Sequence, residues 1–426
     1  MAAKETIGER KVQMAHDPVE YIRGLQQLLI SDKKKVAFLF GAGTSLAKKN
    51  ENTITVPNIG KMTKEIEDIL CQNSLYTNAI EEIKQELREK FTVETFLSNI
   101  EQKSQIIENG TLNGLKKVQF VELAEEIKKL IKERVSIHEK ISMDNSVHAD
   151  FAEWIGRADK KQAIEIFTTN YDYLFELGLE YKNIPYYDGF TGSYQPFFDA
   201  NSVENMDFLS NQTKLWKIHG SLGWYFDKQC KKIIRRDINS ADLLIYPSTL
   251  KYDESKKQPY MALGDRLTNF LKLPDTILIT CGYSFGDEHI NERILTALKS
   301  NSLTHVFALY YNKSLTEESS ICKIAKSESK ISVYSQRHAV IGSQFGFWKL
   351  KREPSKNDLI PIGSYFDEDG PNDPNSEIGK ESKGTESWTG EGELKIPDFG
   401  HFVAFLQQMM FPANVELRHI VEGQDK

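Results

Sequence analysis

Apolar residues follow two different spacings along this chain, and each spacing predicts a different kind of element. Between residues 18 and 30 they recur every three to four positions, which is typical of a helix that buries one stripe. Asp17 is suited to cap this helix, with Pro18 at its first position. Residues 36–40 are continuously apolar between charge and glycine, which is typical of a strand buried on both faces of a parallel sheet.

The pattern then changes twice. Residues 60–145 are rich in Glu, Lys, Leu and Ile, with almost no Pro or Gly over long stretches, and predict three to five amphipathic helices. From residue 151 short apolar strands alternate with helices again, at 163–170, 214–220, 242–247, 275–284 and 305–311. Such alternation is typical of a doubly wound sheet. We therefore expect an α/β fold, a Rossmann-like parallel sheet that carries a large inserted all-helical subdomain.

This organisation divides the chain into four predicted parts. The α/β core starts at 1–45, the helical insertion spans 46–150, the core is completed at 151–350, and a C-terminal appendage covers 351–426. Within the appendage, residues 367–393 are rich in Gly, Ser and acids and nearly lack aliphatic residues, which predicts a flexible, solvated loop. The apolar segment that follows is a helix candidate that we expect to pack back on the fold.

Charge and apolar content narrow the class of protein. The 426 residues include 54 Lys and Arg against 61 Asp and Glu, a net charge of −7 that argues against a protein that coats a polyanion. The densest basic cluster, at 231–236, is more simply a solvated hairpin edge than a nucleic-acid site. The N-terminus lacks the apolar core of a secretory signal, and no apolar run approaches the roughly 18 residues of a membrane span. We expect a cytoplasmic protein.

Cysteine usage narrows the class further. The chain has four cysteines, and no two are close enough for a CxxC pair: Cys71, Cys230, Cys281 and Cys322. This spacing excludes a zinc ribbon and a disulfide scaffold.

The first candidate for chemistry is a glycine-rich turn directly after the apolar run at 36–40, formed by Gly41, Ala42, Gly43 and Ser45. Small residues let the backbone approach a ligand closely, and a helix after such a turn favours a phosphate. The turn lacks the full GxGxxG spacing, and no GK[ST] follows as in a P-loop. Taken alone, it fits a nucleotide site and an ordinary turn equally well.

Three further turns follow predicted strands. Thr168, Asn170 and Asp172 follow the apolar run at 163–167. The last two suit a ribose hydroxyl, a water or an amide, or else cap the next helix. His219 ends the strand at 214–220. The imidazole of a histidine has an ordinary pKa near 6.5 that suits general-base work, although a lone histidine is more often a core residue.

The last turn contains Gly282, Ser284 and Asp287. Ser284 and Asp287 could bind ribose hydroxyls, whereas Asp287 is equally placed to cap the helix that follows.

The order of these turns resembles the NAD-binding core of the sirtuin family, in which GAG-x-S, T-x-N-x-D, HG and a G-x-S turn follow one another. The match runs through Gly41–Ser45, Thr168–Asp172, His219–Gly220 and Gly282–Ser284, within roughly residues 30–350. The chain departs from deacylase sirtuins in lacking their four-cysteine zinc module, because only Cys230 lies in that region. The usual G-I-P-D-F-R stretch is also missing, with only a faint echo at 56–62.

These departures resemble the bacterial sirtuin-like NAD hydrolases of antiphage defence. The likeness rests on the helical insertion, the TTNYD motif at 168–172 and the GYSFGDEHIN turn at 282–291. The chain length and the terminal helix are also similar to members that assemble with a HerA-type motor ATPase. The resemblance implies NAD+ as substrate, no metal, a homo-oligomer, and control by a partner or a phage-derived trigger.

The resemblance also implies roles for individual residues. Asn170 would hold the nicotinamide ribose and the attacking water, His219 would act as general base, and Asp172 would orient the amide or the ribose. In the cofactor-binding set, Ala42, Gly43 and Ser45 would receive the pyrophosphate, and Gly282, Ser284 and Asp287 would hold the adenosine side. Gly41 and Thr168 complete the set. Two alternatives stay open: an NAD-dependent protein deacylase, and a non-catalytic sensor or assembly module that binds NAD or ADP-ribose.

Overall fold

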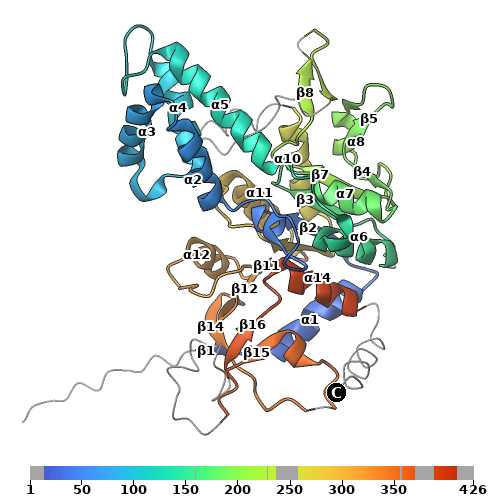
Figure 1. The fold of residues 1–426 in the computed structure, drawn as a ribbon. Coiled ribbons are helices and arrows are strands. Elements are labelled where there is room, and N and C mark those ends of the chain that lie inside the picture. The colour runs from blue at the N-terminus through green and yellow to red at the C-terminus, as the bar shows by residue number, and fades with distance from the viewer. Residues whose placement is uncertain are drawn as a thin grey trace, which may run out of the picture.

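The computed structural model describes residues 14–409 apart from 159, 228, 237–257, 356 and 370–387. Their centre is a ten-stranded sheet with helices on both faces (Figure 1). Six strands form its parallel middle, in the spatial order β12-β11-β10-β2-β3-β7. Their bounds are β2 Lys35–Phe40, β3 Glu165–Thr168, β7 Thr213–Lys217, β10 Thr276–Cys281, β11 His305–Leu309 and β12 Ile331–Tyr334.

The strand order determines where a ligand can bind. Within this parallel middle the chain starts at β2, adds β3 and β7 on one side, and then returns to add β10, β11 and β12 on the other. This is the 3-2-1-4-5-6 order of a doubly wound dinucleotide-binding sheet. The reversal between β2 and β10 leaves a crevice at their carboxyl ends. The predicted mixed α/β fold with a large parallel sheet is confirmed.

The continuous apolar run of β2 is explained by burial on both faces. Val36, Phe38 and Phe40 belong to the core on one face, and Ala37 and Leu39 belong to the core on the other. Successive side chains of a strand point to opposite faces, so a strand covered on both sides needs apolar residues throughout. The helices that contribute to the first core are α1 Pro18–Ile30, α6 Val147–Arg157, α7 Leu174–Tyr181 and α14 Phe399–Gln408.

The second face and the sheet edges complete the architecture. The second core takes residues from α10 Tyr260–Leu271, α11 Glu288–Ser300 and α12 Ser320–Ser327. The sheet is extended at one edge by β13 His338–Ile341, β14 Gln344–Trp348 and β1 Met14–His16, and at the other by β4 Tyr186–Tyr187. The expected cap of α1 is confirmed, because the Asp17 carboxylate accepts a hydrogen bond from the Val19 amide.

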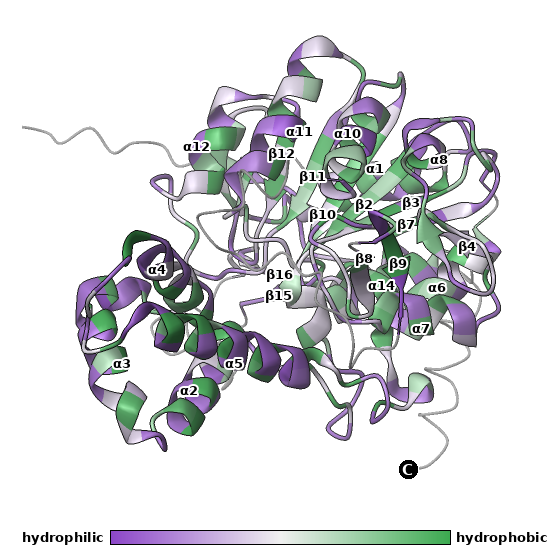
Figure 2. Cartoon of the chain, turned by 90° about the horizontal axis from the view of Figure 1, so that it is seen from above, coloured by the Kyte–Doolittle hydropathy of each residue, from purple (hydrophilic) through white to green (hydrophobic). Residues whose placement is uncertain are grey.

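The segment between β2 and β3 contains the predicted helical insertion. Its helices are α2 Ile59–Leu70, α3 Ser74–Leu87, α4 Val93–Ile106 and α5 Lys117–Val135. They share a core of their own, which Leu174 and Leu222 of the α/β part also join. Figure 2 shows the four helices as a separate lobe, with hydrophobic stripes on otherwise hydrophilic helices. The insertion therefore folds by the amphipathic pattern that predicted it.

The expectations for the segments 231–236 and 242–247 have different outcomes. The segment at 242–247 lies outside the described residues. The basic cluster at 231–236 contains β9 Lys232–Arg235, which pairs antiparallel with β8 Trp224–Asp227 as the expected hairpin. These strands join β5 Phe190–Thr191 and β6 Phe197–Phe198 in a four-stranded sheet. Ile233 and Ile234, in the middle of this basic run, are buried.

The C-terminal helix packs against the sheet, as expected. The ring of Phe399 on α14 contacts that of Phe40 on β2 at 5.3 Å, and the Phe402 ring lies 6.1 Å from that of Phe38. The ends of the predicted loop 367–393 form part of a two-stranded sheet, β15 Phe366–Glu368 with β16 Gly392–Leu394. The rest of that loop, 370–387, lies outside the described residues. The four domain boundaries stay a prediction.

Several features expected from composition concern the described part of the chain. There, no helix is long and apolar enough to cross a membrane. No group of three or more His, Cys, Asp or Glu side chains in the same part could hold a metal ion. All four cysteines are unpaired thiols, and Cys281 and Cys322 are buried.

Helix α6, which packs on one face of the sheet, contains a buried histidine. The ring of His148 packs 4.7 Å from that of Phe175 and 5.2 Å from that of Phe399. Its Nε2 has no hydrogen-bond partner among the described residues. Burial is the main reason that the pKa of His148 falls from 6.5 to about 4.

We expect this histidine to make stability depend on pH. An unfolded histidine takes up a proton below about pH 6.5, whereas the folded chain holds His148 neutral until about pH 4. Its contribution is therefore fully present above pH 6.5 and is lost as the pH falls towards 4. The melting temperature should fall between neutral pH and about pH 5, and it should fall less steeply in His148→Phe. Equal slopes for both proteins would contradict this prediction.

Candidate functional site

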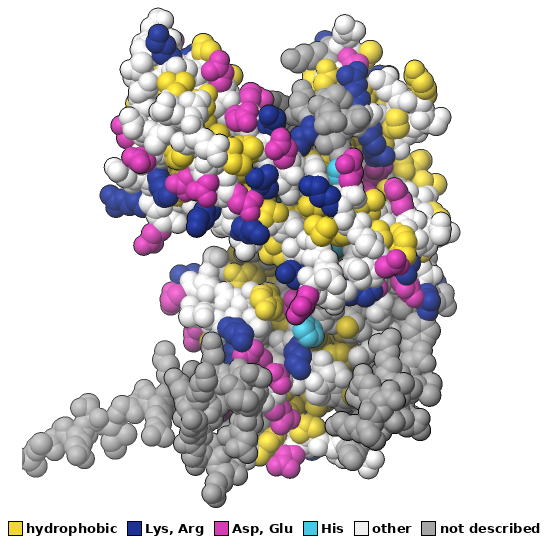
Figure 3. All heavy atoms as spheres, viewed as in Figure 1, with side chains coloured by type: hydrophobic (Ala, Val, Ile, Leu, Met, Phe, Trp, Pro, Cys, Tyr) yellow, Lys and Arg dark blue, Asp and Glu magenta, His cyan; other side chains and the backbone are white. Residues whose placement is uncertain are grey.

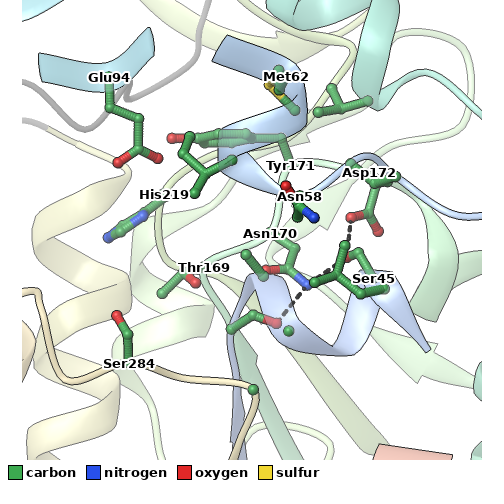
Figure 4. Close-up of a pocket in the computed structure, with 18 of the residues that line it drawn as sticks. Ser45, Asn58, Met62, Glu94, Thr169, Asn170, Tyr171, Asp172, His219 and Ser284 are labelled. Atoms are coloured by element: carbon green, nitrogen blue, oxygen red, sulfur yellow. Dashed lines mark hydrogen bonds between the residues drawn. The ribbon is translucent and has the colours of Figure 1, made fainter. Parts of the chain in front are cut away.

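A cavity of about 480 Å³ lies at the crevice where the strand order reverses (Figure 4). Four turns contribute to its wall: Gly41 follows β2, Asn170 follows β3, His219 follows β7 and Gly282 follows β10. Its volume lies in the range of small-molecule sites, roughly 300–1,000 Å³. Four motifs that are far apart in the sequence thus line one pocket, and every predicted site residue except Thr168 lines it.

The two glycine turns touch each other at the base of the pocket. The amide of Gly43 donates a hydrogen bond of 3.0 Å to the carbonyl of Gly282. A Cβ at Gly43 would stand 2.6 Å from the Gly282 Cα, and Gly282 itself has a φ of +65°. Glycine is needed here because two backbones meet. The Gly43 amide is therefore already engaged, and the turn continues as the short 3-10 helix η1 Ala42–Leu46.

The Asn170 side chain is buried, and its amide nitrogen points into the first turn. The Nδ2 group donates to the Gly41 carbonyl at 3.1 Å, the Thr44 hydroxyl at 3.1 Å and the Ser45 hydroxyl at 2.9 Å. The amide has only two N–H groups, so these contacts use its donors fully. The Oδ1 atom is the remaining polar group, and it can only accept hydrogen bonds. Asn170 is thus suited to hold a water or a hydroxyl.

Asp172 joins the second motif to the first. One carboxylate oxygen accepts a hydrogen bond of 2.6 Å from the Ser45 hydroxyl, and the other accepts from the Leu174 amide at the start of α7. The capping interpretation is therefore part of its role. Ser45 donates to Asp172 and accepts from Asn170, so its hydroxyl belongs to an internal network. This network fixes the Asn170 amide relative to the glycine turn.

The base of the network is reinforced by a buried lysine. The Lys217 ammonium, 2% exposed, donates to the Asp172 backbone carbonyl and lies 3.1 Å from the Glu176 carboxylate. The pKa of Glu176 is raised, mainly by burial, and the charge of Lys217 opposes that shift. Lys217 is two residues before His219, and sequence patterns did not single it out because a lysine in a strand is ordinarily solvated.

The turn after β7 contacts the turn after β10 through a histidine and a carboxylate. The Nε2 of His219 lies 3.0 Å from one oxygen of Asp287, and both side chains are mostly buried. The other oxygen of Asp287 accepts from the backbone amides of His289 and Ile290 and so caps α11. The capping interpretation of Asp287 is therefore confirmed, and the cap holds the carboxylate in place against the imidazole.

The other predicted residues have simpler positions. Thr168 is fully buried at the end of β3, where its hydroxyl accepts a hydrogen bond from the backbone amide of Asn170. Ala42 and Ser284 are exposed at the pocket, and the Ser284 hydroxyl accepts from the Gly286 amide. Thr168 thus supports the motif and does not line the cavity.

The helical insertion supplies a wall that sequence patterns did not predict. Glu94 is in the first turn of α4, and in Figure 4 its carboxylate lies on the same side of the pocket as His219 and Ser284. Asn58 caps α2 nearby and was visible in the sequence only as a faint echo. Apolar insertion residues complete this wall: Val56, Ile59, Met62, Val93, Ile131 and Val135. Glu94 gave no signal because similar glutamates recur throughout the amphipathic helices.

The charge of the pocket is one-sided. Its lining includes the carboxylates of Glu94, Asp172 and Asp287, and no lysine or arginine is among the described residues that line it. Carboxylates in a poorly solvated site stabilise positive charge. The pocket is therefore suited to a cationic group or to a reaction that develops positive charge.

Comparisons with known proteins relate one part of the chain to a described family. A family model described as a SIR2-like domain matches residues 164–333, which include the last three motifs. Among solved structures, the chain matches one described as "Structural Basis for the Mechanism and Regulation of Sir2 Enzymes" at 13% identity and a TM-score of 0.32. That match covers 71% of this chain and 89% of the other. No curated protein matched the sequence.

Proposed function

We propose that this protein is an NAD+ hydrolase that releases nicotinamide and ADP-ribose. The observation that carries the proposal is the convergence of Asn170, His219 and Asp172 on one pocket at the crevice of a dinucleotide-binding sheet. The acidic lining supports it as well, because loss of nicotinamide develops positive charge on the ribose.

The reaction can be written with these residues in named roles. The bond between the ribose C1′ and the nicotinamide nitrogen breaks, and its electron pair leaves with neutral nicotinamide. A water held by the Asn170 Oδ1 attacks the oxocarbenium-like C1′, and His219 accepts the proton. Asp287 orients the imidazole, and Asp172 holds Ser45 and Asn170 in position. The products are nicotinamide, ADP-ribose and one proton.

Isotope labelling tests this assignment directly. Purified protein in water enriched in oxygen-18 should give ADP-ribose that carries the label at the C1′ hydroxyl. Transfer of ADP-ribose to another acceptor, or recovery of intact NAD+ from the pocket, would contradict hydrolysis.

We extend the proposal to the setting of the reaction. Regulated NAD+ depletion in bacterial antiphage defence is supported by the resemblance in motif order and by the helical insertion. The proposed setting includes a cytoplasmic homo-oligomer, a HerA-type ATPase as partner and a phage-derived trigger. Cells that express the chain with a HerA-type partner should lose NAD+ after phage infection, and cells that express His219→Ala should keep it. Unchanged NAD+ in both would contradict the defence role.

The pair formed by His219 and Asp287 gives a specific prediction. Asp287→Asn keeps a good helix cap but removes the carboxylate beside the imidazole. We expect kcat to fall about 10- to 100-fold, as for other groups that orient a catalytic imidazole, with little change in KM. Steady-state kinetics of nicotinamide release measures both constants.

A matched control separates positioning from stability. Asp398 caps α14 in the same way, since its carboxylate accepts from the His401 amide, and it does not line the pocket. Asp398→Asn should leave kcat unchanged. If both variants lose activity equally, a general effect of helix capping explains the loss and Asp287 has no special role.

A further inference from the structure

A second cavity adjoins the candidate site on the side of the insertion. It measures about 490 Å³ and lies among the 46–58 segment, α2 and the C-terminal end of α5. The two cavities share part of their walls, because both are lined by Leu46, Val56, Pro57 and Asn58. None of the predicted site residues lines this second cavity.

The second cavity differs from the first in charge. Its lining has four cations, Lys48, Lys61, Arg134 and Lys140, against the carboxylates of Glu65 and Glu133. Glu65 is compensated by Arg134, 2.7 Å away, with Lys61 at 3.9 Å. Lys48 and Lys140 have no ion pair with another described residue. Figure 3 shows basic and acidic side chains interspersed over the helical lobe, so the excess of cations is a property of the cavity lining. The cavity therefore attracts anions.

Apolar side chains beside these cations narrow the class of ligand. Leu46 and Ile54 line the second cavity and are 38% and 43% exposed. Exposed aliphatic surface next to unpaired ammonium groups suits a ligand with a flat apolar part and phosphates. A nucleoside diphosphate has both.

The shared wall connects this cavity to the Asn170 network. The Val56 amide donates a hydrogen bond of 3.2 Å to the backbone carbonyl of Ser45. Ser45 in turn bonds to Asn170 and Asp172. A ligand that holds Val56 also holds Ser45, and ordering this segment in advance lowers the entropy cost of binding in the first pocket.

We propose that the second cavity is a regulatory site for a phosphate-bearing nucleotide, and that its occupation favours NAD+ binding in the adjoining pocket. The binding step stands on the cavity itself, whereas the effect on turnover rests on the proposed hydrolase function. ADP, ADP-ribose and inorganic pyrophosphate share the diphosphate, and titrating each distinguishes a free nucleotide from the reaction product and from a simple anion.

Calorimetric titration of the full chain with ADP tests the site. Lys48→Gln/Lys140→Gln removes the two unpaired cations, and Lys64→Gln/Lys129→Gln makes the same charge change at exposed lysines of the insertion that do not line the cavity. The first double variant should bind one equivalent of ADP fewer than the wild type and the control. Equal stoichiometry and affinity in all three proteins would overturn the proposal, as would undiminished binding of adenosine with no binding of pyrophosphate.

The kinetic arm tests the coupling. Any competition by pyrophosphate in the first pocket is the same in the wild type and in Lys48→Gln/Lys140→Gln, so their difference reports the second cavity. At saturating pyrophosphate the KM for NAD+ should be about 5-fold lower or more in the wild type than in this variant. Equal KM values would overturn the coupling. Loss of one ADP site in a chain that never consumes NAD+ would contradict the hydrolase proposal and leave the nucleotide site standing.

Discussion

His219→Ala is expected to reduce the rate of NAD+ consumption by about 10²- to 10⁴-fold, the usual contribution of a positioned general base. The imidazole lines the pocket and is held by Asp287, so its removal takes the proton acceptor away from the attacking water. The side chain borders the pocket and is not part of the apolar cores, so we expect its truncation to leave the fold intact. Nicotinamide release under saturating NAD+ measures the loss, and the melting temperature should change little.

His401→Ala is the matched control, because His401 is exposed on α14 and does not line the pocket. This variant should keep wild-type turnover. An active His219→Ala protein would remove the proposed base from the mechanism.

Gly282→Ala is expected to abolish most activity by pushing the two glycine turns apart. A Cβ at this position would lie 2.6 Å from the Thr44 backbone nitrogen, and the φ of +65° is unfavourable for alanine. The turns that would move carry the Asn170 partners Gly41 and Thr44. Displacement of reacting groups by about 1 Å can cost about 10²-fold in rate, so we expect a loss of at least that size.

Gly342→Ala separates steric displacement from backbone strain. Gly342 has a similar φ of +57°, but a Cβ there would meet no atom within 4 Å. The strained backbone should cost both variants roughly 1–2 kcal/mol of stability, and the contact with Thr44 adds a further loss in Gly282→Ala alone. Gly282→Ala should also lose turnover, whereas Gly342→Ala should keep it. Equal activity of the two proteins would show that contact between the turns does not matter for catalysis.

The parallel core could be predicted from the sequence because its strands are buried on both faces. Continuous apolar runs such as 36–40 mark these strands, and polar or glycine residues follow where they end. Carboxyl ends of parallel strands meet at one edge, so the order of the motifs already predicted that Gly41, Asn170, His219 and Gly282 lie together.

The hydrogen bonds inside the site could not be predicted in the same way. Ser45 and Asp172 are 127 residues apart, and His219 and Asp287 are 68 apart. A motif identifies which side chains face a crevice, but partner choice depends on ångström-scale placement of separate turns. Asp287 therefore was assigned to the adenosine side in the sequence, whereas its carboxylate lies against His219. The role of each residue in binding NAD+ stays a proposal.

The position of Glu94 at the pocket also could not be predicted from the sequence. The periodicity of 93–106 predicts a helix, but it does not determine how that helix is oriented over a sheet formed by distant segments. The same holds for the second cavity, which depends on the packing of the 46–58 segment against the end of α5.

The measurement that most directly tests the central claim is product analysis of the purified full-length protein with NAD+, with and without an acetylated peptide. The account predicts equal amounts of nicotinamide and ADP-ribose, formed at the same rate whether or not the peptide is present, and lost in His219→Ala. NAD+ consumption that requires the peptide and yields acetylated ADP-ribose would contradict the account in favour of a deacylase. NAD+ that binds and is recovered intact would contradict it in favour of a sensor.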